Sequence, residues 1–284
     1  MTRAGTEKEA RGPSALAIDG VGKVYVSRQG WVDAVQACTL EIKPGSFYVL
    51  VGPSGCGKTT LLNIVAGFDD PTSGQVRLGS QVIAAKGMSL RPGPDRMVVF
   101  QHDGLFPWMT VLENVCYGPV RQGQLSRNEA RHGARAMLSK VGLAGIEKAY
   151  PARISSGMRR RVEIIRALIS RPKILLVDEP FRALDALTKS VMHDFLLRLY
   201  DVEPFSVFFI THDLLEAIYL GDCVAVMTTR PGRIKHVFQV DLPRPRSHKM
   251  LATREFLQLK DDVTEAVHEE AVKAFVAGER ELAR

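Results

Sequence analysis

The sequence has no apolar run approaching the roughly 20 residues that a membrane-spanning helix needs. Its most hydrophobic stretch, residues 205–210, is followed by the polar residues Thr211, His212 and Asp213. The first 13 residues mix basic and acidic side chains and lack the apolar segment of a secretory signal peptide. We therefore expect a chain that does not itself cross a bilayer.

Cysteine is scarce and scattered. The four cysteines form no C-x-x-C pair and have no histidine cluster nearby, which argues against structural zinc and against a disulfide framework. Free cysteines of this kind fit a reducing cytosol. Hydrophobic residues make up 45% of the chain and charged residues 24%, so the sequence can bury a sizeable core and is not disordered by composition.

Charge is unevenly distributed along the chain, which carries 38 − 31 = +7 overall. Residues 159–173 and 230–249 each sum to 6 − 1 = +5, whereas residues 251–284 sum to 5 − 8 = −3. A basic excess favours an anionic partner such as nucleotide phosphate, nucleic acid or an anionic membrane surface. Taken alone, however, the charge favours ordinary solvated arginine and lysine side chains over such a partner.

Strand patterns alternate with helix patterns, which indicates an α/β fold around a central parallel sheet. The Ser126-x-x-Glu129 capping box and the Ser155-Ser156 pair each open a helix. Strands are predicted over residues 16–26, 37–42, 47–51, 75–83, 98–101, 174–177, 207–210 and 223–227. Helices are predicted over residues 59–66, 126–141, 155–168 and, as an amphipathic terminal helix, 256–274.

One segment matches the pattern G-x-x-x-x-G-K-[ST] in full, between a predicted buried strand and a predicted helix. Glycines let backbone N–H groups approach a phosphate with no Cβ atom in the way. Lys58 places a cation on the β- and γ-phosphates, and the Thr59 hydroxyl is a ligand for Mg²⁺. The residues predicted to bind the nucleotide here are Gly52, Pro53, Ser54, Gly55, Cys56, Gly57, Lys58, Thr59 and Thr60.

Polar side chains at the ends of three other predicted strands complete a candidate catalytic site. Asp178 and Glu179 follow a buried strand, where ligands of open α/β sheets bind. Asp178 is predicted to hold Mg²⁺, and Glu179 to polarise the attacking water. Gln101, at a strand end, suits a metal or water contact, and His212 suits a hydrogen bond to the γ-phosphate. The predicted catalytic residues are Lys58, Glu179 and His212.

These motifs, in this order, resemble those of the ATP-binding subunit of ABC transporters over about residues 16–242. The resemblance also rests on the segments Ile154–Arg161 and Ala183-Leu184-Asp185. It implies a P-loop NTPase of the ABC type, with a parallel-sheet core, an N-terminal antiparallel β subdomain and a helical subdomain at about residues 102–158. The implied limits are a polar tail over 1–14, the ATPase domain over 15–242, and a C-terminal helical extension over 243–284.

The resemblance implies that two copies clamp two ATP molecules head to tail, with Mg²⁺. Each site would combine one copy's P-loop with the other copy's Ser155, Ser156 and Gly157, and the resemblance makes Asp185 a further nucleotide-binding residue. Tyr25 matches the aromatic residue on which adenine stacks.

The chain departs from the family pattern at the implied dimer seam. Ser156 adds a Cβ atom and a hydroxyl where the family has glycine, and Met158 replaces a hydrogen-bonding glutamine. Arg182 stands where serine or glycine is usual. These changes bear on turnover and dimer affinity, whereas the P-loop and Glu179 are intact.

Within the family, several segments are similar to importers of nitrate, sulfonate, taurine or bicarbonate, among them Gly93–Arg96, Leu105–Trp108 and Phe181–Thr188. The implied partners are a second copy, a membrane permease received near Leu105–Trp108, and indirectly a solute-binding protein, on the cytoplasmic face of the membrane. Nucleic acid is not an expected partner. Two alternatives remain open: an ABC-type ATPase that acts on nucleic acid or the ribosome, and a P-loop kinase.

Overall fold

The computed structural model describes residues 13–27, 30–89, 91–102, 104–202 and 204–282. The predicted polar tail over 1–14 therefore lies almost entirely outside the described residues. No helix of the described part is long and apolar enough to cross a membrane.

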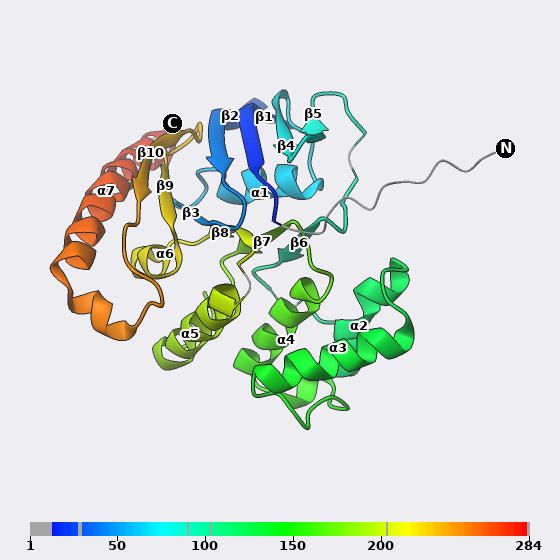
Figure 1. The fold of residues 1–284 in the computed structure, drawn as a ribbon. Helices are drawn as coiled ribbons and strands as arrows, with labels where there is room; N and C mark the ends of the chain where they lie inside the picture. The colour runs from blue at the N-terminus through cyan, green and yellow to red at the C-terminus, as the bar shows by residue number, and fades with distance from the viewer. Residues whose placement is uncertain (1–12, 28–29, 90, 103, 203, 283–284) are drawn as a thin grey trace.

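Two sheets organise the chain (Figure 1). A four-stranded antiparallel sheet has the order β2-β1-β4-β5, and a six-stranded sheet has the order β10-β9-β3-β8-β7-β6, parallel except for β10. The antiparallel sheet contains β1 (Leu16–Ser27), β2 (Gly30–Ile42), β4 (Ser73–Leu78) and β5 (Gln81–Ala85). The second sheet contains β3 (Phe47–Val51), β6 (Arg96–Val99), β7 (Ile174–Asp178), β8 (Ser206–Ile210), β9 (Cys223–Met227) and β10 (Ile234–Gln239). Both the parallel core and the N-terminal antiparallel sheet are confirmed.

Two predicted strands differ from those found. The single strand predicted over 75–83 is a hairpin, because Gly79 takes a left-handed conformation (φ 60°) and turns the chain between β4 and β5. The strand predicted over 98–101 ends at Val99, so Gln101 lies two residues beyond the sheet.

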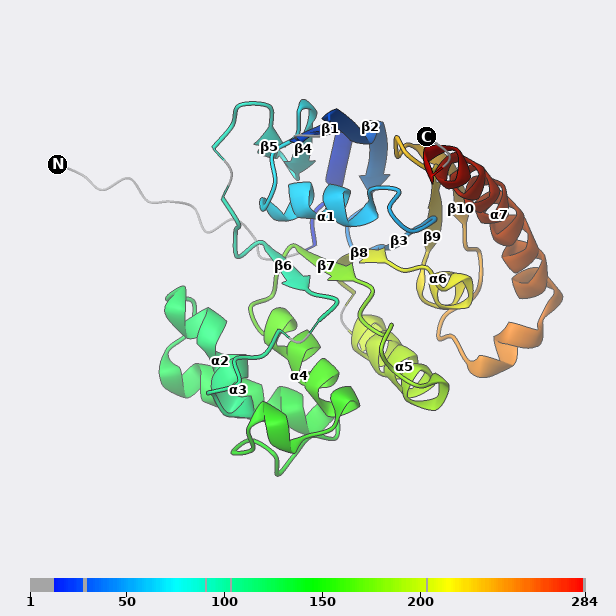
Figure 2. The ribbon, with the colours of Figure 1, turned by 180° about the vertical axis from the view of Figure 1, so that it is seen from behind.

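The helices surround the six-stranded sheet (Figures 1 and 2). Helix α1 lies between the two sheets, α2 to α4 gather beside β6, and α7 runs along the outer edge near β9 and β10. The helices are α1 (Lys58–Ala66), α2 (Val111–Arg121), α3 (Arg127–Lys140), α4 (Ser156–Leu168), α5 (Ala186–Val202), α6 (Leu214–Leu220) and α7 (Arg254–Leu282), with short 3₁₀ turns η1 (Pro151–Arg153) and η2 (His248–Ala252).

Some of these elements have no counterpart in the sequence-based predictions, namely α2, α5, α6 and β10. For α2 the sequence carries a usable signal, because Thr110 and Glu113 form the same reciprocal capping box that was recognised at Ser126. The predicted terminal helix is confirmed as α7, with Phe256 and Val263 buried against the body.

The central strand β3 is buried on both faces. Its alternate residues enter two separate hydrophobic clusters, Phe47 and Val49 on one side and Tyr48 and Leu50 on the other. A strand clamped in this way fixes the loop at its carboxyl end, and that loop is the glycine-rich segment.

Candidate nucleotide site

The glycine-rich loop joins β3 directly to α1. Gly57 is the residue before the first helical turn and takes a left-handed conformation with φ 102°. A Cβ atom at Gly57 would lie 2.6 Å from the carbonyl oxygen of Ala34 in β2. Gly55 is also left-handed, with φ 74°. Only glycine adopts both conformations without strain, so these two positions give the loop its shape.

Lys58 closes the loop on itself. Its ammonium group is buried and donates hydrogen bonds to the carbonyl oxygens of Gly52 at 2.8 Å and Pro53 at 3.0 Å. The ammonium group also lies 3.8 Å from the Cys56 sulfur, and a buried cation held by carbonyl groups and a thiol is available to an anion. With α1 beginning at the same residue, the loop combines a cation with a helix N-terminus and fits a phosphate group.

The predicted magnesium ligands Thr59 and Asp178 are neighbours. The Thr59 hydroxyl donates a hydrogen bond of 3.0 Å to Asp178 Oδ2, although the two residues are 119 positions apart. Burial raises the pKa of the Asp178 carboxyl group, the nearby Glu179 raises it further, and Thr59 and Lys58 oppose the change. A carboxylate and a hydroxyl are the hard oxygen ligands that Mg²⁺ prefers, so this pair fits the ion.

The Glu179 carboxylate is surrounded by three polar side chains. Its Oε2 accepts hydrogen bonds from Gln101 Nε2 at 3.3 Å and from Arg182 Nη1 at 3.2 Å, and lies 3.2 Å from His212 Nδ1. Glu179 has a left-handed backbone, with φ 40°, and its amide donates to the carbonyl of Ile210. The structure therefore brings Gln101, Glu179 and His212 together, as expected for one crevice. Arg182 also contacts Glu179, although the sequence indicated only that this arginine departs from the family pattern.

The 154–161 segment forms a capped helix start. The Ser155 hydroxyl accepts a hydrogen bond of 3.3 Å from the amide of Met158, which makes Ser155 the N-cap of α4. Ser155 and Ser156 are exposed, whereas Gly157 is buried.

The Gly157 position is linked to Asp185 through Thr188. A Cβ atom on Gly157 would lie 3.1 Å from the Thr188 methyl carbon. Asp185 accepts hydrogen bonds from the Thr188 amide (2.9 Å) and hydroxyl (2.6 Å), and these bonds lower the pKa of Asp185. The start of α4 therefore packs against the start of α5. None of these contacts involves the glycine-rich loop.

Tyr25 lies on β1 close to the start of α1. Its hydroxyl donates to Asp69 Oδ2 at 2.6 Å and lies 3.5 Å from the Thr60 hydroxyl oxygen. Lys23 lies 5.0 Å from the centre of the ring and forms an ion pair of 2.5 Å with Asp69. Tyr25 is therefore a half-exposed ring fixed at its polar end, with Lys23 and Asp69 as partners that the sequence did not indicate.

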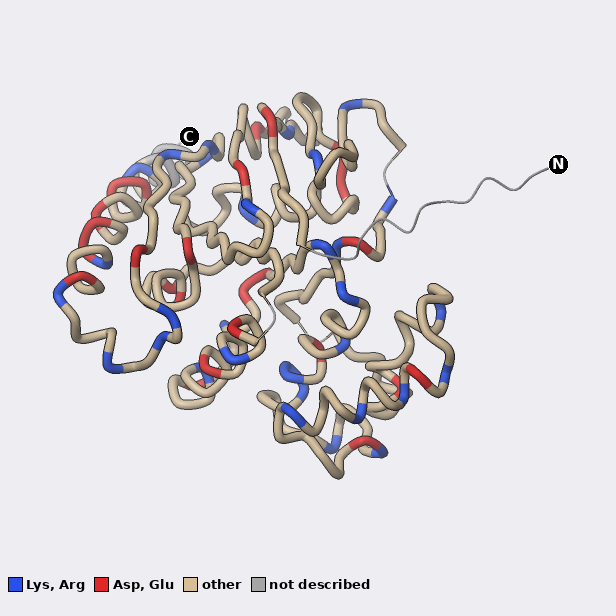
Figure 3. Tube along the Cα trace, in the orientation of Figure 1, with Lys and Arg blue, Asp and Glu red and all other residues tan. Residues whose placement is uncertain are grey.

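The basic run Arg159–Arg161 is directed inward. Arg160 is buried and donates to the carbonyl oxygens of Phe100 (2.7 Å) and Gln101 (2.8 Å). Arg159 donates to Ile154 O and Arg161 to Val141 O. Basic and acidic side chains are interspersed along the described chain (Figure 3). Arg160 therefore holds the Gln101 segment against α4, and the side chains of Arg159 and Arg161 bond to other carbonyl groups within the protein.

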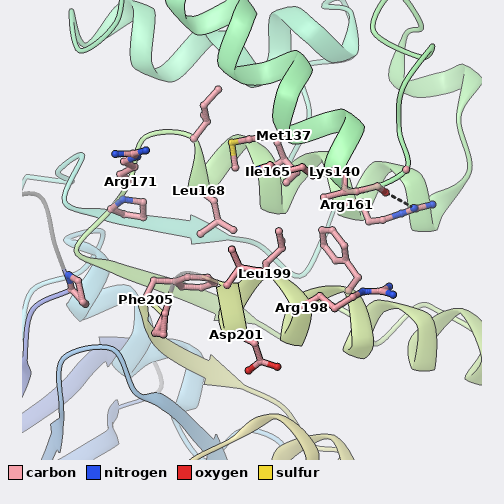
Figure 4. A pocket seen from close by; sticks show the side chains of 18 of the residues that line it. Met137, Lys140, Arg161, Ile165, Leu168, Arg171, Arg198, Leu199, Asp201 and Phe205 are labelled. Carbon is pink, nitrogen blue, oxygen red and sulfur yellow. Dashed lines mark hydrogen bonds between the residues drawn. The ribbon is translucent and has the colours of Figure 1, made fainter. Parts of the chain in front are cut away.

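A cleft of about 930 Å³ lies between α4 and α5 (Figure 4). Its lining includes Pro172 and Phe205, which precede β7 and β8, so it lies at the amino ends of these strands. The glycine-rich loop and the Asp178–Glu179 pair lie at the carboxyl ends. The cleft is therefore separate from the nucleotide site.

A glycine-rich loop between a buried strand and a helix, with an acidic pair at the end of β7, which β8 separates from β3 in the same sheet, defines a P-loop nucleotide-binding protein. Comparison with known proteins specifies the family. Residues 35–182 match the ABC transporter family. An uncharacterised ABC transporter ATP-binding protein of Methanocaldococcus jannaschii is 42% identical over 268 residues, covering 94% of this chain and 97% of the relative. The chain belongs to the ABC transporter family.

Two further relatives carry more specific names. The nitrate import ATP-binding protein NrtD of Synechocystis is 40% identical over 255 residues, covering 88% of this chain and 93% of the relative. The bicarbonate transport ATP-binding protein CmpD of Synechocystis is 39% identical over 259 residues, covering 90% of each chain.

A solved structure shares the fold. It is the dimeric, post-hydrolysis ATP-binding cassette MJ0796 bound to ADP and Pi, with a TM-score of 0.68 and 29% identity, covering 80% of this chain and all of that one. The predicted fold class and family are both confirmed.

Proposed function

We propose that this protein is the ATP-hydrolysing subunit of an importer and that it powers the passage of a small anion through a membrane permease. The observation that carries the proposal is the Glu179 cluster beside the P-loop: a carboxylate held by Gln101 and His212 next to the Thr59–Asp178 pair. The nitrate and bicarbonate relatives support import as the process. Sulfonate and taurine remain candidate solutes from the sequence resemblance.

The residues divide the chemistry among them. The loop amides and Lys58 bind the β- and γ-phosphates, and Thr59 and Asp178 hold Mg²⁺, with Gln101 as a further ligand. Bound Mg²⁺ neutralises charge that develops on the phosphates during transfer. Glu179 accepts the proton of the attacking water, and His212 donates to the γ-phosphate. Tyr25 supports the adenine ring.

A second copy completes each site in this proposal. Ser155, Ser156 and Gly157 of one copy approach the γ-phosphate bound by the other, with Asp185 at the seam. The solved relative MJ0796 is dimeric with ADP and Pi bound, which supports this arrangement. Ser155 and Ser156 are exposed at the start of α4, so a phosphate can approach this helix N-terminus.

The permease contacts the 105–108 segment, which places the protein peripherally on the cytoplasmic face of a membrane. Trp108 is 70% exposed and its ring stacks on Phe106 at 5.5 Å. An exposed Trp108 ring resting on the half-buried Phe106 ring beside α2 suits an apolar partner helix. A solute-binding protein then acts through the permease and not on this chain. The alternative of a nucleic-acid partner gains no support from Arg159–Arg161, whose side chains bond to carbonyl groups within the protein.

The test measures phosphate release from ATP with and without Mg²⁺, for the wild type and for Glu179→Gln. We expect the variant to bind ATP, to lose about 100-fold or more in turnover, and to accumulate as an ATP-bound dimer. Glu41→Gln, on the exposed side of β2, is the matched control and keeps wild-type turnover. Unchanged turnover in Glu179→Gln would remove this residue from the proposed role.

A further inference from the structure

The segment 228–233, between β9 and β10, contacts the glycine-rich loop directly. Arg230 Nε donates a hydrogen bond of 3.0 Å to the carbonyl oxygen of Gly55. Gly232 pairs with β2 through backbone hydrogen bonds to Ala34 and Gln36, and a Cβ atom at Gly232 would lie 2.0 Å from the Cys56 carbonyl oxygen. The segment is therefore packed tightly against the outer side of the loop.

On its other side, the same segment is held by α7. Glu270 of α7 is 2% exposed, and its Oε2 accepts a hydrogen bond of 3.1 Å from the amide of Thr229, the residue before Arg230. Its Oε1 pairs with Lys273 at 2.6 Å and with Lys235 at 3.1 Å. Burial alone would raise the pKa of Glu270, but Lys273, Thr229 and Lys235 together lower it, so the carboxylate is ionised at neutral pH.

A hydrogen-bonded path thus runs from α7 to the glycine-rich loop. A loop that turns its N–H groups toward a phosphate turns carbonyl groups outward, and these need donors of their own. Lys58 satisfies Gly52 and Pro53 from within the loop. Gly55 is satisfied from outside by Arg230, and it is one of the two left-handed positions that shape the loop.

We propose that Glu270 and Arg230 are positioning residues for the nucleotide loop: Glu270 fixes segment 228–233, and Arg230 fixes the Gly55 peptide in the orientation that binds phosphate. The C-terminal helix thereby contributes to nucleotide affinity without contacting the nucleotide. The proposal rests on the proposed phosphate-binding role of the loop and gives a function to α7.

The test compares Arg230→Ala, Glu270→Gln and the double variant by steady-state ATP hydrolysis and by hydrogen exchange of the loop amides in nucleotide-free protein. We expect Arg230→Ala to raise KM for ATP about three- to tenfold, the size of one charge-assisted hydrogen bond, with kcat within about twofold of wild type. The loop amides of residues 52 and 54–57 exchange faster. Glu270→Gln has a smaller effect in the same direction, and adds nothing in the Arg230→Ala background because both act through one contact.

Matched controls lie beside each residue. Glu269, next to Glu270, also pairs with Lys235 but is exposed and accepts no bond from Thr229, so Glu269→Gln keeps the wild-type KM. Arg233, in the same segment, bonds to Gln36 and not to the loop, so Arg233→Ala keeps it as well.

Three results would overturn the proposal. They are unchanged loop exchange in Arg230→Ala, additive effects in the double variant, and recovery of the wild-type KM by Arg230→Met, which retains an unbranched side chain but has no N–H donor. If the wild type failed to hydrolyse ATP, the proposed function would fail, but the hydrogen-exchange comparison would still decide whether Arg230 and Glu270 position the loop.

Discussion

Arg182 forms an ion pair with Glu179, its Nη1 lying 3.2 Å from Oε2. The guanidinium is 58% exposed and the carboxylate 13% exposed, so the contact spans from solvent into the crevice. Gln101 and His212 contact the same oxygen. The residue proposed to activate water is therefore held by an arginine at a position where the family usually has serine or glycine.

Replacing Arg182 by serine should increase turnover. The ion pair occupies the carboxylate oxygen of the proposed base, Glu179. An exposed ion pair contributes up to about 1 kcal/mol, so its removal can raise kcat by about fivefold at most. The measurement is kcat for ATP hydrolysis in Arg182→Ser, with Arg182→Lys as the variant that retains the charge. A fall in kcat for Arg182→Ser would show that the arginine assists hydrolysis.

Lys58→Ala should abolish nucleotide binding and also lower stability. Removal of the ammonium group takes away the cation and leaves the carbonyl groups of Gly52 and Pro53 without their donor, which costs about 1–3 kcal/mol. Binding of a fluorescent ATP analogue and thermal unfolding report the two effects. Lys43→Ala, in an exposed turn, is the control. Retained binding in Lys58→Ala would contradict the phosphate site.

Asp178→Asn should stabilise the nucleotide-free protein while it abolishes Mg²⁺-dependent hydrolysis. Because burial raises the pKa of Asp178, the folded state binds more protons than the unfolded chain between the two pKa values. Stability therefore falls as pH rises through that window. Asparagine removes the buried charge and keeps an acceptor for Thr59.

Thermal unfolding at pH 5 and pH 7.5 measures this effect of Asp178→Asn. At pH 7.5 we expect Tm to rise by about 2–4 °C for each 1 kcal/mol recovered. Asp33→Asn, on the exposed side of β2, should leave both Tm and hydrolysis unchanged. A lower Tm for Asp178→Asn at pH 7.5 would show that the carboxylate is stabilised in the folded protein.

Ser155→Gly should separate helix capping from phosphate binding. Glycine is nearly as good an N-cap as serine, so stability falls by only a few tenths of a kcal/mol, but the hydroxyl proposed to reach the partner's γ-phosphate is lost. In a Glu179→Gln background, sedimentation with ATP should show less dimer. Ser126→Gly, at the N-cap of α3, is the control. An unchanged dimer fraction would remove the Ser155 hydroxyl from the seam.

Trp108→Asp should disrupt permease binding and leave the isolated subunit intact. The side chain is 70% exposed, so its replacement costs little stability and leaves basal ATP hydrolysis within about twofold. Co-purification with an integral membrane partner measures the effect. Trp31 of β2 is also an exposed tryptophan and serves as the control: the Trp31→Asp variant should still co-purify with the membrane partner. Loss of the partner in both variants would point to a general effect of surface charge.

The sequence by itself determined the parts of the site that lie within one short segment. The P-loop spacing, the strand that precedes it and the Ser126 capping box are local patterns, and local hydrogen bonds fix local geometry. The strand at 47–51 and the helix that follows it were predicted for this reason. The hairpin at Gly79 was missed because strand-like composition continues across the turn, and only a left-handed glycine shows that the chain reverses.

Only the tertiary structure decided which distant residues meet. Arg160 reaches the Gln101 carbonyl across 59 positions, and Arg230 reaches Gly55 across 175. No spacing rule links such pairs, because the order of strands in the sheet and the packing of α4 and α7 set their distances. For the same reason the sequence shows only that Arg160 belongs to a basic run. The structure shows that its side chain is buried and donates hydrogen bonds to backbone carbonyl groups.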